Sequence, residues 1–273
     1  MNDSDKKGGS LFPRREVDDL STHAHRQIIG SVGLLLPVLL WLIAGWRPLG
    51  ARPWAPLSSI SAYYYTGSVS VFAGMLVTMA LFLFAYHGYA NKYYLRDRIA
   101  AVIASGAAIL VALFPTGAPI EFMAPAWWTP ITGFIHFASA TVLFGSFIFF
   151  CLFQFPMANK KKSKPLPRAK KLRNVVYFAC GAAMTMCIMW AVFAALTGKP
   201  IFWPEALALE FFALSWLVKG RAYATVAAAG RKTVYYARHP RTLVKDVQSA
   251  VQSQPPAEPA EPRTKRRTSS GKP

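Results

Sequence analysis

Six apolar runs of roughly membrane-spanning length dominate the chain. A hydrocarbon core about 30 Å thick needs about 20 residues of helix, at about 1.5 Å per residue. Because backbone groups in lipid must bond within their own segment, continuous runs predict helices, whereas barrel strands alternate over about ten residues. The sequence therefore predicts an all-α membrane protein, a bundle of six transmembrane helices. The expected spans are residues 27–46, 68–89, 99–114, 130–155, 174–197 and 203–218.

The segments outside these runs hold too few apolar residues for a second core. We expect residues 1–26 to be a polar cytoplasmic arm and residues 27–219 to be the membrane domain. In the juxtamembrane segment 220–252, Val244, Val247 and Val251 share one helical stripe, which predicts an interfacial helix over residues 240–252. Residues 253–273 form a basic tail without apolar periodicity, which we expect to be disordered.

The charge distribution predicts how the spans are oriented. The chain carries 31 Lys and Arg against 12 Asp and Glu, a net charge of +19, although 53% of its residues are hydrophobic. With six spans, all of the cations except Arg47, Arg52 and Lys199 fall on one side of the membrane. Positive loops stay on the cytoplasmic side. Both termini are therefore expected in the cytoplasm (N-in, C-in), in a bacterial inner (plasma) membrane.

A basic loop between the fourth and fifth spans lies next to the membrane. Such a cluster attracts anionic headgroups by about 1 kcal/mol per cation, so membrane lipids on the cytoplasmic side are the expected partners. Nucleic acid is not expected, because no nucleic-acid-binding fold accompanies the charge, and the sequence leaves a homo-oligomer open. The expected lipid contacts are Lys160, Lys161, Lys162, Lys164 and Arg168.

Two ionisable residues lie inside predicted spans, where a charge is costly. His136 and Glu210 each lie about seven residues into their spans, which places both about 10 Å from the non-cytoplasmic interface. His136 shares a polar helical stripe with Thr132 and Ser139, which should face the bundle interior. Two interpretations stay open. Either His136 and Glu210 meet and line an outward-facing pocket, or they make structural polar contacts that fix the helix register.

The loop before the second span, residues 57–67, is rich in hydroxyl and aromatic side chains and carries no charge. As a functional element it would be a lid or a headgroup-binding strip, with Ser59, Ser61 and Tyr64 as pocket candidates. As a structural element it would be an aromatic belt at the membrane interface. Glu205, at the start of the last span, is expected to be stabilised by the positive end of the helix dipole.

No metal or cofactor is expected. Catalytic zinc needs three protein ligands, whereas only one of the five histidines is deep in a span. Cys180 and Cys187 share a helical stripe with Met184, which indicates packing rather than a redox site. The sequence contains no G-x-S-x-G, H-E-x-x-H, G-x-G-x-x-G or Walker motif. The third span carries a small-residue ridge, which lets a neighbouring helix approach closely, at Ala100, Ala104, Ala108 and Ala112.

Two short motifs resemble those of an uncharacterised family of bacterial six-span inner-membrane proteins. They are S-x-S-x-Y-Y-x-T-G at residues 59–67 and F-P-T at residues 114–116. More remotely, residues 27–218 resemble the damage-regulated autophagy modulator (DRAM-like) family. The resemblance implies six spans and a serine-bearing outer loop. That family usually has an aspartate after the serine, where this chain has Ala62, so no catalytic role is carried over.

Together these features predict a polytopic integral inner-membrane protein that binds a lipid or small amphiphile in an outward-facing polar pocket. Two alternatives stay open. One is a membrane-embedded enzyme that acts on lipid or isoprenoid substrates, with His136 as acid or base and Glu210 as its orienting partner. The other is a small transporter, although the sequence shows neither an inverted repeat nor a pair of broken helices.

Overall fold

The computed structural model describes residues 14–46, 54–87, 94–157, 168–238 and 242. These residues are helical or irregular, and no strand occurs among them. The all-α prediction is therefore confirmed for this part of the chain. Several predictions lie outside the described residues, namely those for residues 1–13, for Lys160, Lys161, Lys162 and Lys164, for the helix over residues 240–252 apart from residue 242, and for the tail 253–273.

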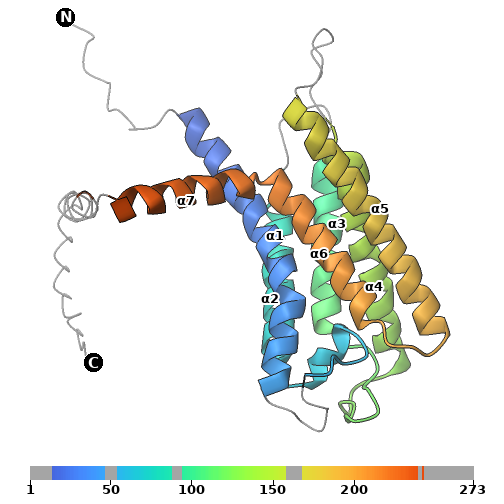
Figure 1. Ribbon diagram of the computed structural model, residues 1–273. Coiled ribbons are helices and arrows are strands. Elements are labelled where there is room, and N and C mark those ends of the chain that lie inside the picture. Colours follow the sequence, from blue (N-terminus) through green and yellow to red (C-terminus); the bar gives the residue numbers. More distant parts are fainter. Residues whose placement is uncertain (1–13, 47–53, 88–93, 158–167, 239–241, 243–273) are drawn as a thin grey trace, which may run out of the picture. The chain divides into compact units, whose positions relative to one another are not determined.

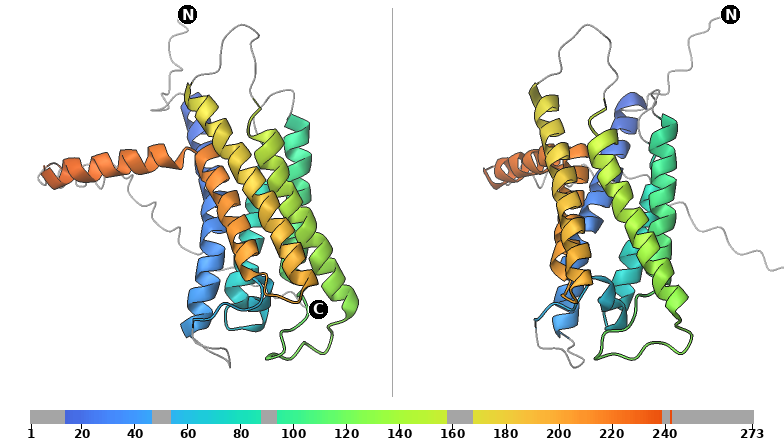
Figure 2. Two further views of the ribbon diagram at one scale, coloured as in Figure 1. Left: turned by 45° about the vertical axis from the view of Figure 1, so that its right-hand side comes forward. Right: turned by 90° about the vertical axis from the view of Figure 1, so that its right-hand side faces the viewer.

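Six α-helices and two short helical segments form one unit within residues 1–223. Successive α-helices run antiparallel, as Figure 1 and both views of Figure 2 show. Helix α1 packs against α2 and α6, α3 lies between α2 and α4, and α5 packs against α6. The elements are α1 (Arg14–Trp46), the 3-10 helix η1 (Ser61–Tyr65), α2 (Val69–Phe84), α3 (Tyr94–Leu113), α4 (Pro130–Phe149), the π-helix η2 (Phe150–Gln154), α5 (Arg168–Leu196) and α6 (Phe202–Lys219).

The two ends of the bundle are named here after the short segments. The η1 end holds η1 together with the first residues of α4 and α6 (Figure 1). The η2 end, on the opposite side of the bundle, holds η2, the first residues of α5 and the last residues of α6.

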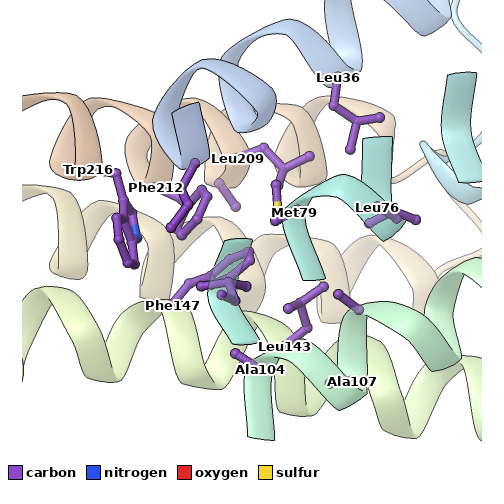
Figure 3. Close-up of a cluster of buried hydrophobic side chains, with 14 of the residues drawn as sticks. Leu36, Leu76, Met79, Ala104, Ala107, Leu143, Phe147, Leu209, Phe212 and Trp216 are labelled. Carbon is purple, nitrogen blue, oxygen red and sulfur yellow. The ribbon is translucent and has the colours of Figure 1, made fainter. Parts of the chain in front are cut away.

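The core lies in the space between the helices. Figure 3 shows buried side chains gathered there from α1, α2, α3, α4 and α6. Phe147 of α4 stacks on Phe212 of α6 with ring centroids 3.7 Å apart. The small-residue ridge predicted for α3 is confirmed, because its four alanines are buried. This ridge lets α3 fit closely between its two neighbours.

Three helical segments in the described part of the chain are long and apolar enough to cross a membrane. They are Thr22–Ala44, Pro130–Gln154 and Arg168–Leu196. Helix α2 is apolar but has 16 residues, or about 24 Å at 1.5 Å per residue. Helix α3 has Arg96, Asp97 and Arg98 in its first turns. Helix α6 has 18 residues and ends on Lys219. These helices support the prediction of a helical membrane protein. In the described part of the chain, length and composition identify three of the six predicted spans.

The limits of α1 and α4 bear on the predicted boundaries. Helix α1 begins at Arg14, so residues 14–26 of the expected arm are helical and extend the first predicted span. Helix α4 continues through η2 to Gln154, as the predicted span over residues 130–155 required. Its start is capped as a capping box, in which the Thr132 hydroxyl accepts a 3.3 Å hydrogen bond from the backbone N–H of Thr129.

A further helix, α7 (Ala222–Arg238), follows the bundle in sequence. Most of it belongs to a separate unit, residues 224–273, and it is described by itself. Its Tyr223, Val226 and Tyr235 side chains are exposed. The sequence interpretation placed a helix in the segment 220–252 but expected it to begin at residue 240, so α7 was missed.

Candidate functional site

His136 is the centre of the polar contacts at the η1 end. It lies on α4 and is 2% exposed. Its Nδ1 is 2.6 Å from the backbone oxygen of Phe114, and its Nε2 is 2.8 Å from the hydroxyl oxygen of Ser61. A carbonyl oxygen only accepts, so Nδ1 carries the proton and Nε2 accepts the Ser61 hydroxyl. His136 thereby joins α4 to the end of α3 and to η1.

Of the two interpretations left open for His136 and Glu210, the structure does not show the one in which they meet. Both ring nitrogens of His136 are engaged with the partners just described. Glu210 lies on the face of α6 that carries Trp203, Leu207 and Leu214, which are 57%, 39% and 46% exposed. The buried face of the same helix carries Leu209 and Phe212 instead. Counting residues gives the distance of Glu210 from the start of its helix. It does not give the face of the helix on which the side chain lies.

Glu205, rather than Glu210, is the acidic residue of α6 that lines a small cavity beside Ser61. It lies in the first turn of α6, as predicted. Its Oε2 accepts a hydrogen bond of 2.7 Å from the backbone N–H of Ile60, just before η1. Stabilisation by the helix dipole was therefore an incomplete explanation, because the carboxylate also holds the loop that carries Ser61.

The serine and tyrosine loop is inserted into the bundle. The Ser59 hydroxyl oxygen accepts a 3.0 Å hydrogen bond from the Ala62 N–H. Tyr63 is 1% exposed and lies against Phe202, with ring centroids 5.9 Å apart. Tyr64 is partly buried and meets Phe72 edge to face. An aromatic belt at the surface does not describe Tyr63, which belongs to the core.

The polar stripe predicted on α4 is largely confirmed. Thr132, His136 and Ser139 are all buried. Ser146, two turns further along, is only partly buried and donates to the carbonyl of Val142 in its own helix. Among the candidates of this stripe, His136 is therefore the one that contacts the serine loop.

A small cavity lies beside these groups. It has room for about 40 Å³ and is lined mainly by apolar side chains of five helices, with Ser61 and Glu205 as polar groups. A cavity needs about 10–15 Å³ on this measure for one water. The space therefore accepts a few waters or a small polar group, and an acyl chain does not fit.

A larger hollow lies elsewhere on the bundle, between α3 and α4. This groove has a volume of about 400 Å³ and is open to the surface. Its walls are mostly apolar, with Ile103 and Val142 among them, and Arg96 lies at its rim near the η2 end. None of the residues that line this groove lines the small cavity with Ser61 and Glu205.

The remaining predictions concern cations and thiols. Arg168, the one predicted lipid contact within the described residues, is exposed at the start of α5. Cys151, Cys180 and Cys187 are free and buried, in line with the packing interpretation of the last two. Within the described ranges, no group of three His, Cys, Asp or Glu side chains is arranged to hold a metal ion.

Comparisons with protein-family models, with curated proteins and with solved structures find no match.

Proposed function

We propose that the chain is a six-span protein of a bacterial inner membrane, with the η2 end and both termini on the cytoplasmic side. The antiparallel order of α1 to α6 supports this, because it gathers the ends of helices that adjoin the basic segments at the η2 end. The three shorter or more charged helices lie in the same bundle as the three long apolar ones.

Labelling with a membrane-impermeant maleimide tests this topology. Met123, before α4 at the η1 end, is 93% exposed, and Lys171 is exposed at the η2 end. With the three native cysteines replaced, Met123→Cys should react in intact spheroplasts. Lys171→Cys should react only after the membrane is permeabilised. The reverse pattern contradicts the orientation.

The function that we propose is binding of the polar part of a lipid or small amphiphile at the η1 end. The observation that carries it is a mostly apolar cavity with Ser61 and Glu205 in its wall and His136 in contact with Ser61. Ligand sites combine apolar walls with a few placed polar groups in this way. Because the cavity is small, the headgroup enters it and the hydrocarbon part lies outside, which requires η1 to move as a lid.

A pair of cavity variants tests this proposal. Ala140 lines the cavity, whereas Ala138 is exposed on the same helix. Lipid that copurifies with the protein should fall in Ala140→Leu and stay unchanged in Ala138→Leu, as measured by mass spectrometry. Equal lipid content in both variants contradicts binding at this cavity.

A second candidate function is an enzyme that acts on lipid or isoprenoid substrates. It is favoured by the 2.8 Å contact between Ser61 Oγ and His136 Nε2, with Phe114 holding the other ring nitrogen. A nucleophile next to a base that a third group orients is the arrangement of covalent catalysis. Phe114 then replaces Glu210 as the orienting partner, and His136 acts as the base.

Proteoliposome turnover separates the two functions. Under the enzyme hypothesis Ser61→Ala and His136→Ala both abolish turnover, and a serine-directed fluorophosphonate labels Ser61. Turnover that survives in either variant contradicts catalysis by this pair.

A further inference from the structure

Two lysines at the η2 end share a single carbonyl oxygen. The Lys170 ammonium, from the start of α5, donates to the Phe155 oxygen at 3.2 Å and to the Met157 oxygen at 3.3 Å. The Lys219 ammonium, from the end of α6, donates to the same Phe155 oxygen at 3.1 Å. The side chains of Lys170 and Lys219, from two different helices, therefore converge on one carbonyl oxygen.

The surrounding charges keep this region positive. Arg26 is fully buried, with its guanidinium 5.7 Å from the centre of the Tyr86 ring. The charged groups that act on Lys219 are Lys170, Arg26 and Arg173, which are cations, and Asp97. Around Lys219 this group of residues holds three cations and one carboxylate, and burial together with the neighbouring cations lowers the pKa of Lys219 well below its ordinary value. The surplus charge is therefore positive, and we name these residues the η2-end cationic cluster.

Two buried residues near the η2 end carry polar atoms without hydrogen-bond partners in the described part of the chain. Gln154 is 6% exposed, and neither its Nε2 nor its Oε1 has a hydrogen-bond partner in the described part of the chain. The same holds for Nε1 of Trp216, a fully buried residue. Folded proteins satisfy nearly all buried polar atoms, so such groups ask for an explanation. A bound polar ligand is one explanation that fits these three atoms.

Their position connects these atoms to the lysines. Gln154 directly precedes Phe155, whose carbonyl oxygen the lysines share. The Trp216 ring meets the Phe155 ring edge to face at 5.2 Å, and Trp216 lies one helical turn before Lys219 on α6. Gln154 is the last residue of the π-helix η2, and single-turn π-helices occur frequently at functional sites.

We propose that the η2-end cationic cluster is a binding site for a phosphate group. Its donors would come from the partly buried Lys170 and Lys219 and from the buried Gln154 and Trp216. Phosphate carries several acceptor oxygens, which suit donors from two ammonium groups, one amide and one indole. The phosphate comes either from a phospholipid headgroup or from a free solute. This proposal is independent of the proposed function at the η1 end.

Phosphate binding is tested on the purified full chain by its effect on the melting temperature. Inorganic phosphate, titrated against sulfonate buffer at constant ionic strength, should raise the melting temperature of the wild type. Lys170→Gln should lose this shift and weaken phosphate binding by about tenfold or more. Lys171→Gln is the matched control, because Lys171 is the next residue and is exposed, and it should keep the shift. Equal shifts in the two variants, or no shift in the wild type with any phosphate source, overturn the proposal.

A second pair of variants keeps the test informative if the lysine variants fold poorly. Gln154→Glu places a carboxylate where the phosphate would lie, and Gln154→Met is its neutral counterpart. Without phosphate, Gln154→Glu should melt at a higher temperature than Gln154→Met, and phosphate should not raise it further. A lower melting temperature than Gln154→Met, or an undiminished phosphate shift, overturns the proposal.

Nanodiscs distinguish the two sources of phosphate. If the ligand is a lipid headgroup, phosphatidylglycerol nanodiscs should stabilise the wild type more than Lys170→Gln, relative to phosphatidylcholine nanodiscs of the same size. If the ligand is a free solute, inorganic phosphate should stabilise the wild type within phosphatidylcholine nanodiscs. Stabilisation in neither arm contradicts the site.

Discussion

The two ends of the bundle differ in whether their buried polar groups have hydrogen-bond partners. At the η1 end, both nitrogens of His136 have partners, and the carboxylate of Glu205 holds the N–H of Ile60. At the η2 end, two lysines share one carbonyl, while Gln154 lacks partners within the described residues. A ligand at the η1 end must break existing hydrogen bonds, whereas a ligand at the η2 end would complete missing ones. The second end is thus better prepared to bind a polar ligand.

This difference separates structural from ligand-binding effects of mutations. Variants at the η1 end should lower stability whether or not a ligand is present. Substitutions of Lys170 at the η2 end should change stability mainly when the anion is present.

The largest effect is expected for His136→Ala. The change removes two hydrogen bonds and takes the histidine partner away from the partly buried Ser61 hydroxyl and Phe114 carbonyl. We expect a loss of about 2–3 kcal/mol in the free energy of unfolding, measured by reversible unfolding in mixed micelles. Ser146→Ala on the same helix, which removes only a bond within α4, should change stability by less than about 0.5 kcal/mol.

Glu205→Ala should have the next largest effect. It leaves the N–H of Ile60 without its carboxyl acceptor, which costs about 2 kcal/mol. Glu210→Ala, on the exposed face of the same helix, should stay within about 0.5 kcal/mol of the wild type. A larger loss for Glu210→Ala than for Glu205→Ala would show that the inward face of α6 has been assigned wrongly.

A smaller effect is expected where η2 rests on α5. A β-carbon added at Gly181 would lie 2.3 Å from Leu152 of η2, whereas one added at Gly145 would meet nothing within 4 Å. Gly181→Ala should therefore lose about 1–2 kcal/mol, because Leu152 must shift. Gly145→Ala should be neutral or slightly stabilising, because alanine favours helix. Thermal unfolding of both variants measures this, and equal stabilities would contradict the packing of η2.

The smallest effect is expected for the coupling energy between the substitutions His136→Ala and Glu210→Ala, measured as a difference in stability. Because the two side chains point to different sides, the stability losses of His136→Ala and Glu210→Ala should add within about 0.3–0.5 kcal/mol in the double variant. A coupling energy above about 1 kcal/mol would restore the pairing that the structure excludes.

Much of the fold could be predicted from residue types at helical spacing. The stripe of Thr132, His136 and Ser139 was placed inward because a helix repeats on one face every three or four residues. On α6 the same helical spacing places Leu209 and Phe212 on the buried face and leaves Glu210 outside that face. The depth of a residue follows from counting, but its direction follows from its neighbours along the helix.

The contacts that form the sites could not be predicted in the same way. Ser61 and His136 are 75 positions apart in the sequence, and no local pattern encodes their contact. Lys170 was interpreted as one of many cations that orient the bundle. Its convergence with Lys219 on Phe155 depends on how the ends of α5 and α6 meet η2. Counting charges along the chain cannot predict that Lys170 and Lys219 meet at Phe155.

One measurement tests the contrast between the two ends directly, namely the rise in melting temperature that inorganic phosphate causes in three proteins. We predict that the wild type and Ser61→Ala show the same rise, although Ser61→Ala melts at a lower temperature throughout. Lys170→Gln should show no rise. A rise that disappears in Ser61→Ala and persists in Lys170→Gln would contradict the assignment of the anion site to the η2 end.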